Sequence, residues 1–159
     1  MVLKPLQSVK LLGMFLDQHL TMSNHIDKVC KKCHGLLGAL SRAAPFLPEK
    51  LLKLAYTALI RSHLEYASTI VAMASNTQLH KLDVIQKAAA RTITRSPRLA
   101  HSEPLLSKLK LESLTDRRSR HMNNIVESTM NGRCHPSLKS PFMRDEEGNL
   151  TINYRPRTA

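Results

Sequence analysis

The scarcity of aromatic side chains sets the strongest limit on what this chain can fold into. The 159 residues include three Phe, three Tyr and no Trp, although 42% are apolar. A core built mainly from Leu, Ile, Val, Ala and Met suits helix packing better than the facing sheets of a β-sandwich. Five glycines are also few for a chain with many tight turns. We therefore expect a mainly α fold with a modest core.

Apolar residues recur at helical spacing through the middle of the chain. The pattern predicts helices over about 21–42, 48–71 and 77–94, the first capped by Thr21 or Ser23. Shorter helices are expected after Ser102 and from about 115 to Gly132, a residue type that often ends helices. From 133 onward the pattern dissolves, so we expect 133–159 to be a disordered tail.

A short apolar segment precedes these helices. Val9 to Leu16 is apolar and has polar neighbours, which predicts a buried β-strand. Gly13 within it indicates a bulge or a close approach of the backbone to another segment. The remaining sequence offers no convincing second strand, so the segment resembles the last strand of a sheet whose other strands are missing.

The charge balance favours a polyanionic partner. The formal net charge is +12 and the isoelectric point is about 10.1. Nucleic acid is the preferred partner over an anionic membrane surface, and a merely solvated basic surface is the alternative. The N-terminus has no apolar run typical of a signal peptide, and no segment approaches the roughly 20 apolar residues of a membrane span. We expect an intracellular protein, in the nucleus or cytoplasm, with no membrane partner.

The basic residues gather on two predicted helix faces. Lys87, Arg91 and Arg95 recur every fourth residue and lie about 180° from an apolar stripe. Such an array can follow a phosphate backbone, although an ordinary solvated helix face is the alternative. The predicted nucleic-acid-binding residues are Lys87, Arg91, Arg95, Arg98, Lys28, Lys31 and Lys32.

The sequence lacks the groups that polymerisation requires. Nucleotide transfer needs metal ions held by carboxylates, including an adjacent Asp pair, and no Asp here is adjacent to another. The acidic run at 145–147 lies in the expected tail, where a solvated run is the better interpretation. The sequence has no Gly-rich phosphate loop and no nucleophile elbow. We expect no catalytic residue, metal or cofactor in this chain.

Two short motifs invite other chemistry. Cys30-Lys31-Lys32-Cys33-His34 matches a haem-attachment pattern, but both cysteines lie on the apolar stripe of a predicted helix, so core thiols are preferred. Zinc bound by Cys30, Cys33, Cys134 and His135 would need unusual ligand spacing. The run 63–66 (HLEY) contains acid and base groups without a third partner, so a structural role is preferred.

The order of several motifs carries a resemblance. Residues 11–17 (LLGMFLD) are followed by His19-Leu20-Thr21, by 58–67 (ALIRSHLEYA), by Gln86 to Ile93 and by Asn131-Gly132. This series resembles the region downstream of the catalytic palm in LINE-type (jockey-like, non-LTR) retrotransposon reverse transcriptases. It covers roughly 8–132, and it departs from the family at Leu11, Met22 and Val71, where aromatic residues are usual.

The resemblance implies the arrangement of domains and the function. Residues 1–20 would be the end of the palm, and 21–132 a thumb-like bundle of three to five helices that contacts the template–primer duplex. The parent enzyme would be an RNA-directed DNA polymerase with a divalent metal, and this chain alone would be inactive. Implied partners are an RNA–DNA hybrid or RNA and the missing palm. The alternative is a decayed or repurposed helical protein with only structural or partner-binding roles.

Overall fold

The structure is a computed structural model that describes residues 7–134, 142–144 and 150–152. The fold is mainly α, as the composition predicted. The chain forms two units, Met1–Arg118 and Ser119–Ala159. In order, the elements are β1 (Ser8–Leu11), β2 (Met14–Asp17), α1 (Ser23–Ala43), α2 (Glu49–Ala55), the π-helix η1 (Tyr56–Arg61), α3 (Ser62–Leu64), α4 (Ser68–Val71), α5 (Asn76–Thr94), α6 (Ser102–Lys108), α7 (Leu114–Met130), β3 (Phe142–Arg144) and β4 (Leu150–Ile152).

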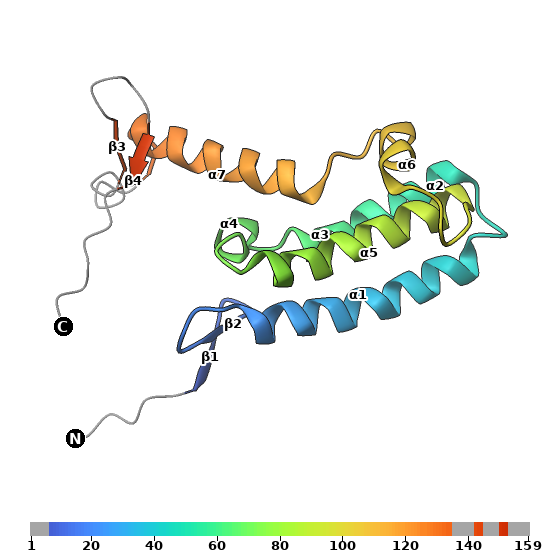
Figure 1. Cartoon of the computed structure of the whole chain (residues 1–159), viewed down its shortest axis with the longest axis horizontal. Helices are drawn as coiled ribbons and strands as arrows, with labels where there is room; N and C mark the ends of the chain where they lie inside the picture. Colours follow the sequence, from blue (N-terminus) through green and yellow to red (C-terminus); the bar gives the residue numbers. More distant parts are fainter. Residues whose placement is uncertain (1–6, 135–141, 145–149, 153–159) are drawn as a thin grey trace. The chain divides into compact units, whose positions relative to one another are not determined.

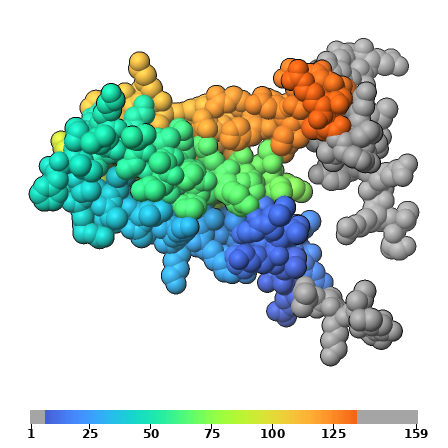
Figure 2. All heavy atoms as spheres, turned by 180° about the vertical axis from the view of Figure 1, so that it is seen from behind, coloured from blue at the N-terminus to red at the C-terminus, as the bar shows by residue number. Residues whose placement is uncertain are grey.

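The core of the first unit lies where α1 and α5 run side by side and α2, η1 and α3 pack against them (Figure 1). From behind, the N-terminal hairpin, α1 and the helix that follows it form one continuous packed surface (Figure 2). The predicted apolar stripes of α1 and α5 are confirmed, whereas Leu51 and Leu59 on the second predicted helix are exposed. Every member of the α5 stripe is buried, and on α1 the stripe is buried except at two half-buried positions, Val29 and Leu37. The buried members are Ile26, Cys30, Cys33, Leu40, Leu82, Ile85, Ala89 and Ile93.

The predicted single buried strand is wrong. The segment is a two-stranded antiparallel hairpin in which Leu11 pairs with Met14. Its turn consists of Leu12 and Gly13, both at positive φ (47° and 85°), a conformation that favours glycine and matches the twist of a hairpin. β1 is exposed along its length, and Met14 is the buried residue of β2. Periodicity could not divide the apolar run because the turn itself contains an apolar residue.

The start of α1 is held by a residue outside the predicted helix. The carboxylate of Asp17 accepts hydrogen bonds from the amides of Thr21 (3.0 Å) and Met22 (3.0 Å). The Thr21 hydroxyl accepts from the amide of Ser23 at 3.3 Å, but Met22 is the N-cap residue of α1, so the prediction of Thr21 or Ser23 as the cap was wrong. Donation from the Thr21 amide is the main cause that lowers the pKa of Asp17, against a smaller opposing effect of burial. The carboxylate of Asp17, at the end of β2, therefore holds the residues that lead into α1.

The second predicted helix ends earlier than expected. Its turns in α2, η1 and α3 follow one another in right-handed helical geometry as far as Glu65. Ala67 then takes a left-handed conformation (φ 50°), and the short α4 begins anew. The predicted continuation to about Val71 was wrong because the apolar period persists across this reversal of the backbone.

The later helices begin and end close to the predicted positions. Ser113 accepts a hydrogen bond from the amide of Asp116 (3.1 Å) at the start of α7. Gly132 has φ 71°, and its amide bonds to the carbonyl of Thr129 (3.1 Å), which confirms it as the residue that ends α7. β3 and β4 pair antiparallel in the second unit, and the rest of the expected tail after Cys134 lies outside the described residues.

Candidate nucleic-acid interface

Two of the predicted phosphate-binding arginines are held by main-chain carbonyls. Arg91 Nε donates to the carbonyl of Ala100 at 2.9 Å. Arg95 donates from Nε (3.0 Å) and Nη2 (2.7 Å) to the carbonyl of Ala44, and from Nη2 to that of Leu47 (2.8 Å). Carbonyl oxygens orient a guanidinium without placing a negative charge beside it.

Arg95 also ends α5 through its backbone. It has φ 54°, in the left-handed region where a residue with a Cβ is unfavourable. The amide of Arg95 bonds to the carbonyl of Thr92 (3.3 Å), and the amide of Ser96 to that of Arg91 (2.9 Å). This pair of bonds is the Schellman arrangement, which usually has glycine at the position of Arg95. The side-chain bonds to the end of α1 account for an arginine in place of that glycine.

These arginines border a groove between α1 and α5, which we call the arginine groove. Its walls carry hydroxyl groups of Ser41, Thr92 and Ser96, and the imidazole of His34. Val84 and Ala88 form part of its apolar surface. None of the described residues that line it is acidic. The groove is lined by His34, Leu37, Ser41, Ala44, Pro45, Val84, Ala88, Arg91, Thr92, Arg95, Ser96 and Arg98.

Acidic side chains of the first unit are paired with cations at other places. Asp27 bonds to Lys81 (2.7 Å) and Glu49 to Lys108 (3.2 Å), both on exposed surface. Glu65 pairs with Arg117, and Asp83 pairs with Arg118. The positive charge of the arginine groove is therefore not offset by the carboxylates in these pairs.

The remaining predicted residues are divided between two places. Arg98 is exposed at the arginine groove, and Lys87 is half-buried one turn before Arg91. Lys28, Lys31 and Lys32 are exposed on the N-terminal half of α1. The Lys28 ammonium lies 3.1 Å from the centroid of the Phe15 ring. The structure thus does not bring the α1 lysines and the α5 arginines into one cluster.

Arg117 and Arg118 form ion pairs that stabilise the fold of the first unit. Arg117 donates to both carboxylate oxygens of Glu65, one of them at 2.8 Å, and approaches Glu112 at 3.5 Å. These contacts raise the pKa of Arg117, with the hydrogen bond to Glu65 as the largest cause. Arg118 is buried and bonds to Asp83 and to the carbonyl of Leu114 (3.1 Å). Glu112 lies five residues before Arg117 in the sequence, whereas Glu65 and Asp83 are distant in sequence from their arginines.

The last three residues of the run 63–66 also form contacts that stabilise the fold. Leu64 is buried, and Glu65 holds Arg117. The Tyr66 hydroxyl donates to the carbonyl of Leu12, which joins the segment after α3 to the turn of the N-terminal hairpin. These contacts support the structural interpretation of this run over an acid–base role.

Cys30 and Cys33 are buried core thiols, as their place on the apolar stripe indicated. Burial raises the pKa of both, that of Cys33 to about 11. A thiol with a raised pKa is a poor metal ligand and nucleophile at neutral pH. Among the described residues no group of three or more His, Cys, Asp or Glu is placed to hold a metal ion. His135, one of the alternative zinc ligands, lies outside the described residues.

The sequence pattern missed several members of the groove. His34, Ser41 and Ser96 lie on no basic stripe, and only the packing of α1 against α5 brings them together.

None of the helices in the described part of the chain combines the length and apolar character needed to cross a bilayer. No protein-family model, curated protein or solved structure matches this chain.

Proposed function

We propose that this chain is a thumb-like region of a non-LTR retrotransposon reverse transcriptase that holds a template–primer duplex through its phosphates. The RNA-directed DNA polymerase activity and its divalent metal belong to the parent enzyme and its palm. The observation that carries the binding proposal is the arginine groove, which has three arginines and no carboxylate among the described residues that line it.

The groove suits phosphate oxygens because its cations are positioned in advance. A guanidinium has five N–H donors. The bonds to Ala44, Leu47 and Ala100 use only part of the donors on Arg95 and Arg91. The remaining guanidinium donors offer further hydrogen bonds to a phosphodiester, whereas the Thr92 hydroxyl already donates to the carbonyl of Ala88 at 3.1 Å.

Binding of this kind is insensitive to sequence and sensitive to salt. Neutralising phosphates releases counterions, so the logarithm of the affinity falls linearly with the logarithm of the salt concentration. About three phosphate contacts in the groove would give a slope of roughly −3 for a duplex.

The test measures fluorescence anisotropy of a labelled RNA–DNA hybrid across a salt titration. Charge reversal of Arg91 or Arg95 would impair folding as well as binding, because both side chains donate to main-chain carbonyls. The informative variant is Arg98→Glu, at an exposed residue of the groove, and the matched control is Lys50→Glu, at an exposed residue of α2, which changes the net charge equally. We expect a loss of affinity and a shallower salt slope in the first variant alone. Equal losses in the two variants would contradict the assignment of the groove.

The same contacts favour a second candidate function. A decayed or repurposed helical protein would retain Arg91 and Arg95 solely to hold the carbonyls of Ala100 and Ala44. In that case the folded wild-type protein binds the hybrid no better than either variant at physiological salt. Failure of binding with intact helical circular dichroism would therefore favour this candidate.

A further inference from the structure

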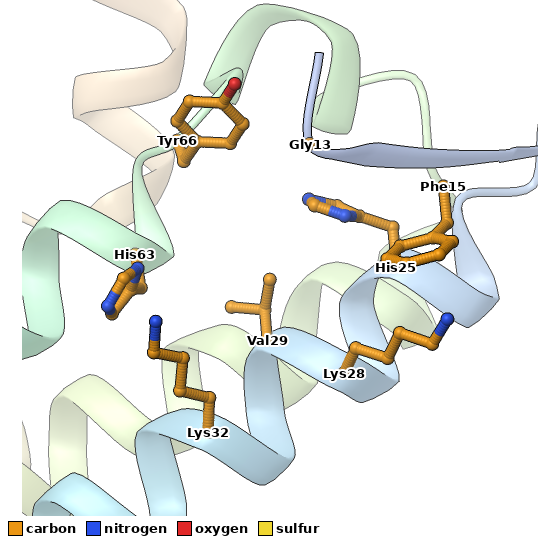
Figure 3. Close-up of a pocket in the computed structure, with 8 residues that line it drawn as sticks. All are labelled: Gly13, Phe15, His25, Lys28, Val29, Lys32, His63 and Tyr66. Carbon is orange, nitrogen blue, oxygen red and sulfur yellow. The ribbon is translucent and has the colours of Figure 1, made fainter. Parts of the chain in front are cut away.

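A second pocket lies beneath the N-terminal hairpin, at the opposite end of α1 from the arginine groove. Figure 3 shows it between the turn of the hairpin, the first turns of α1 and the end of α3. We call it the hairpin pocket. Its volume is about 350 Å³, within the range of about 300–1,000 Å³ typical of small-molecule sites.

The hydroxyl of Tyr66 fixes the hairpin turn that forms one side of the pocket. It donates to the carbonyl of Leu12, in the turn of the hairpin. A Cβ on Gly13 would lie 3.5 Å from this hydroxyl oxygen, so the turn passes directly against the tyrosine ring. Val29 lies across the open space from Tyr66 (Figure 3). The pocket is thus bounded by an aromatic ring on one side and an aliphatic side chain on the other.

His25 gives the pocket an unused hydrogen-bonding atom. His25 is only 4% exposed, and its Nε2 has no hydrogen-bond partner among the described residues. The nitrogen-bearing end of the ring is directed into the space bounded by Tyr66, Gly13 and Val29 (Figure 3). Buried polar atoms are rarely left unpaired, so this nitrogen calls for a partner that a bound molecule can supply.

The charged groups of the pocket are all cationic. Lys28 and Lys32 are exposed and contribute ammonium groups, and no described residue that lines the pocket is acidic. Burial, and then the nearby Lys28, lower the pKa of His25, while burial and Lys32 lower that of His63. Both imidazoles are therefore neutral at pH 7, and a neutral imidazole has one donor and one acceptor nitrogen.

We propose that the hairpin pocket binds one nucleotide, with its base between Tyr66 and Val29 and its phosphate at Lys32. The flat ring matches the aromatic and aliphatic walls, and the edge of the base supplies the missing partner of His25. The phosphate meets ammonium groups at the open side, which leaves Lys28 over the Phe15 ring. A free nucleoside monophosphate and the terminal nucleotide of a strand present this same chemistry.

The inference goes beyond the proposed function and rests on it only for the class of ligand. Tracking a duplex through its phosphates needs no pocket for a base, and the arginine groove shares no lining residue with the hairpin pocket. Either proposal can therefore fail while the other stands.

The test follows the imidazole NMR signals of the full chain during titration with adenosine 5′-monophosphate and uridine 5′-monophosphate. Separate titrations use adenosine, inorganic phosphate and a short oligonucleotide with a 5′-phosphate. We expect saturable shifts of the His25 and His63 signals with the monophosphates, and affinities at least about tenfold weaker for adenosine or phosphate alone, because each lacks one set of contacts. Tighter binding of the oligonucleotide would assign the pocket to strand ends, and tighter binding of the monophosphates to free nucleotides.

Adjacent lysines on α1 provide the matched variants. Lys32 lines the pocket and Lys31 does not, although both are exposed and carry the same charge. We expect Lys32→Gln to weaken monophosphate binding about tenfold and Lys31→Gln to leave it unchanged. Equal losses in the two variants, equal binding of inorganic phosphate, or unshifted imidazole signals would each overturn the proposal. Hybrid binding measured on the same samples separates this result from failure of the arginine groove.

Discussion

The guanidinium of Arg95 bonds through two nitrogens, at 2.7 and 3.0 Å, to the carbonyl oxygen of Ala44, which joins the end of α5 to the end of α1. The last carbonyls of a helix lack intrahelical partners, and a cation there also complements the helix dipole. At the end of α1, Arg95 supplies both a hydrogen-bond donor to a carbonyl and a positive charge. Its own backbone ends α5. One residue thus terminates two helices that are distant in sequence.

Replacing Arg95 separates these two roles. We expect Arg95→Ala to lower the free energy of unfolding by about 2 kcal/mol, because it removes charged donors from the partly buried carbonyl of Ala44 and from that of Leu47. Arg95→Gly loses the same bonds but relieves the left-handed backbone by about 1 kcal/mol, so it should be the more stable of the two. Urea denaturation followed by circular dichroism measures both. Arg98→Ala is the control, and equal stability of the Gly and Ala variants would show that the backbone conformation carries no strain.

The pair of Arg118 and Asp83 gives a second stability prediction. Arg118 has 8% of its side chain exposed and Asp83 has 24%. Breaking a buried ion pair from one side costs about 3–5 kcal/mol, and we expect about 2–3 kcal/mol for Asp83→Ala because its carboxylate is partly hydrated. The double variant Asp83→Leu with Arg118→Met should recover most of the loss, since it leaves no unpaired charge. A double variant as unstable as the single one would contradict this account.

Helical periodicity predicted the parts of the fold that depend on local pattern. Residues such as Ile26 and Ile85 were assigned to the core because they recur at helical spacing, and both are fully buried. The hairpin was missed because its turn uses Leu12, an apolar residue at positive φ that no local pattern distinguishes from a strand residue. Local pattern thus identified the faces of the helices but not every change in backbone direction.

The candidate site was predicted in part. The spacing of Arg91 and Arg95 placed them on a basic face, but the carbonyl that holds Arg95 lies 51 residues earlier in the chain. The pairing of Glu65 with Arg117 spans 52 residues and could likewise not be predicted from the sequence pattern. Such contacts depend on where α1 and α5 end and where α7 begins within the first unit. Spacing predicts which residues are basic neighbours, but not which carbonyl or carboxylate they meet.

The buried hydroxyl of Tyr56 leads to a prediction at alkaline pH. Burial raises the pKa of Tyr56 to about 12 in the folded chain, above its usual value of 10. A raised pKa means that its stabilising effect is complete below pH 10 and is lost as the pH rises through 12. The hydroxyl forms no close hydrogen bond among the described residues, although the Gln86 side chain near it lowers the pKa against the larger effect of burial, so Tyr56→Phe should change stability at pH 8 by no more than about 1 kcal/mol.

The difference between wild type and Tyr56→Phe isolates this titration from that of the lysines. Between pH 10 and 11.5 the stability of the wild type should fall more steeply than that of the variant in urea denaturation. Parallel curves for the two proteins would show that the Tyr56 hydroxyl titrates normally.

His25 leads to the opposite dependence in acid. Burial and Lys28 lower its pKa, so the folded chain favours the neutral imidazole. The stabilising effect of a depressed histidine is complete above its unfolded value of 6.5 and is lost as the pH falls toward the folded pKa. We expect the free energy of unfolding to decrease between pH 7 and pH 5, and His25→Phe to flatten this decrease because it cannot take up a proton. His34→Phe on the exposed face of α1 is the control. A decrease of the same size in His25→Phe would assign the acid sensitivity to other groups, among them His63, whose pKa is also lowered.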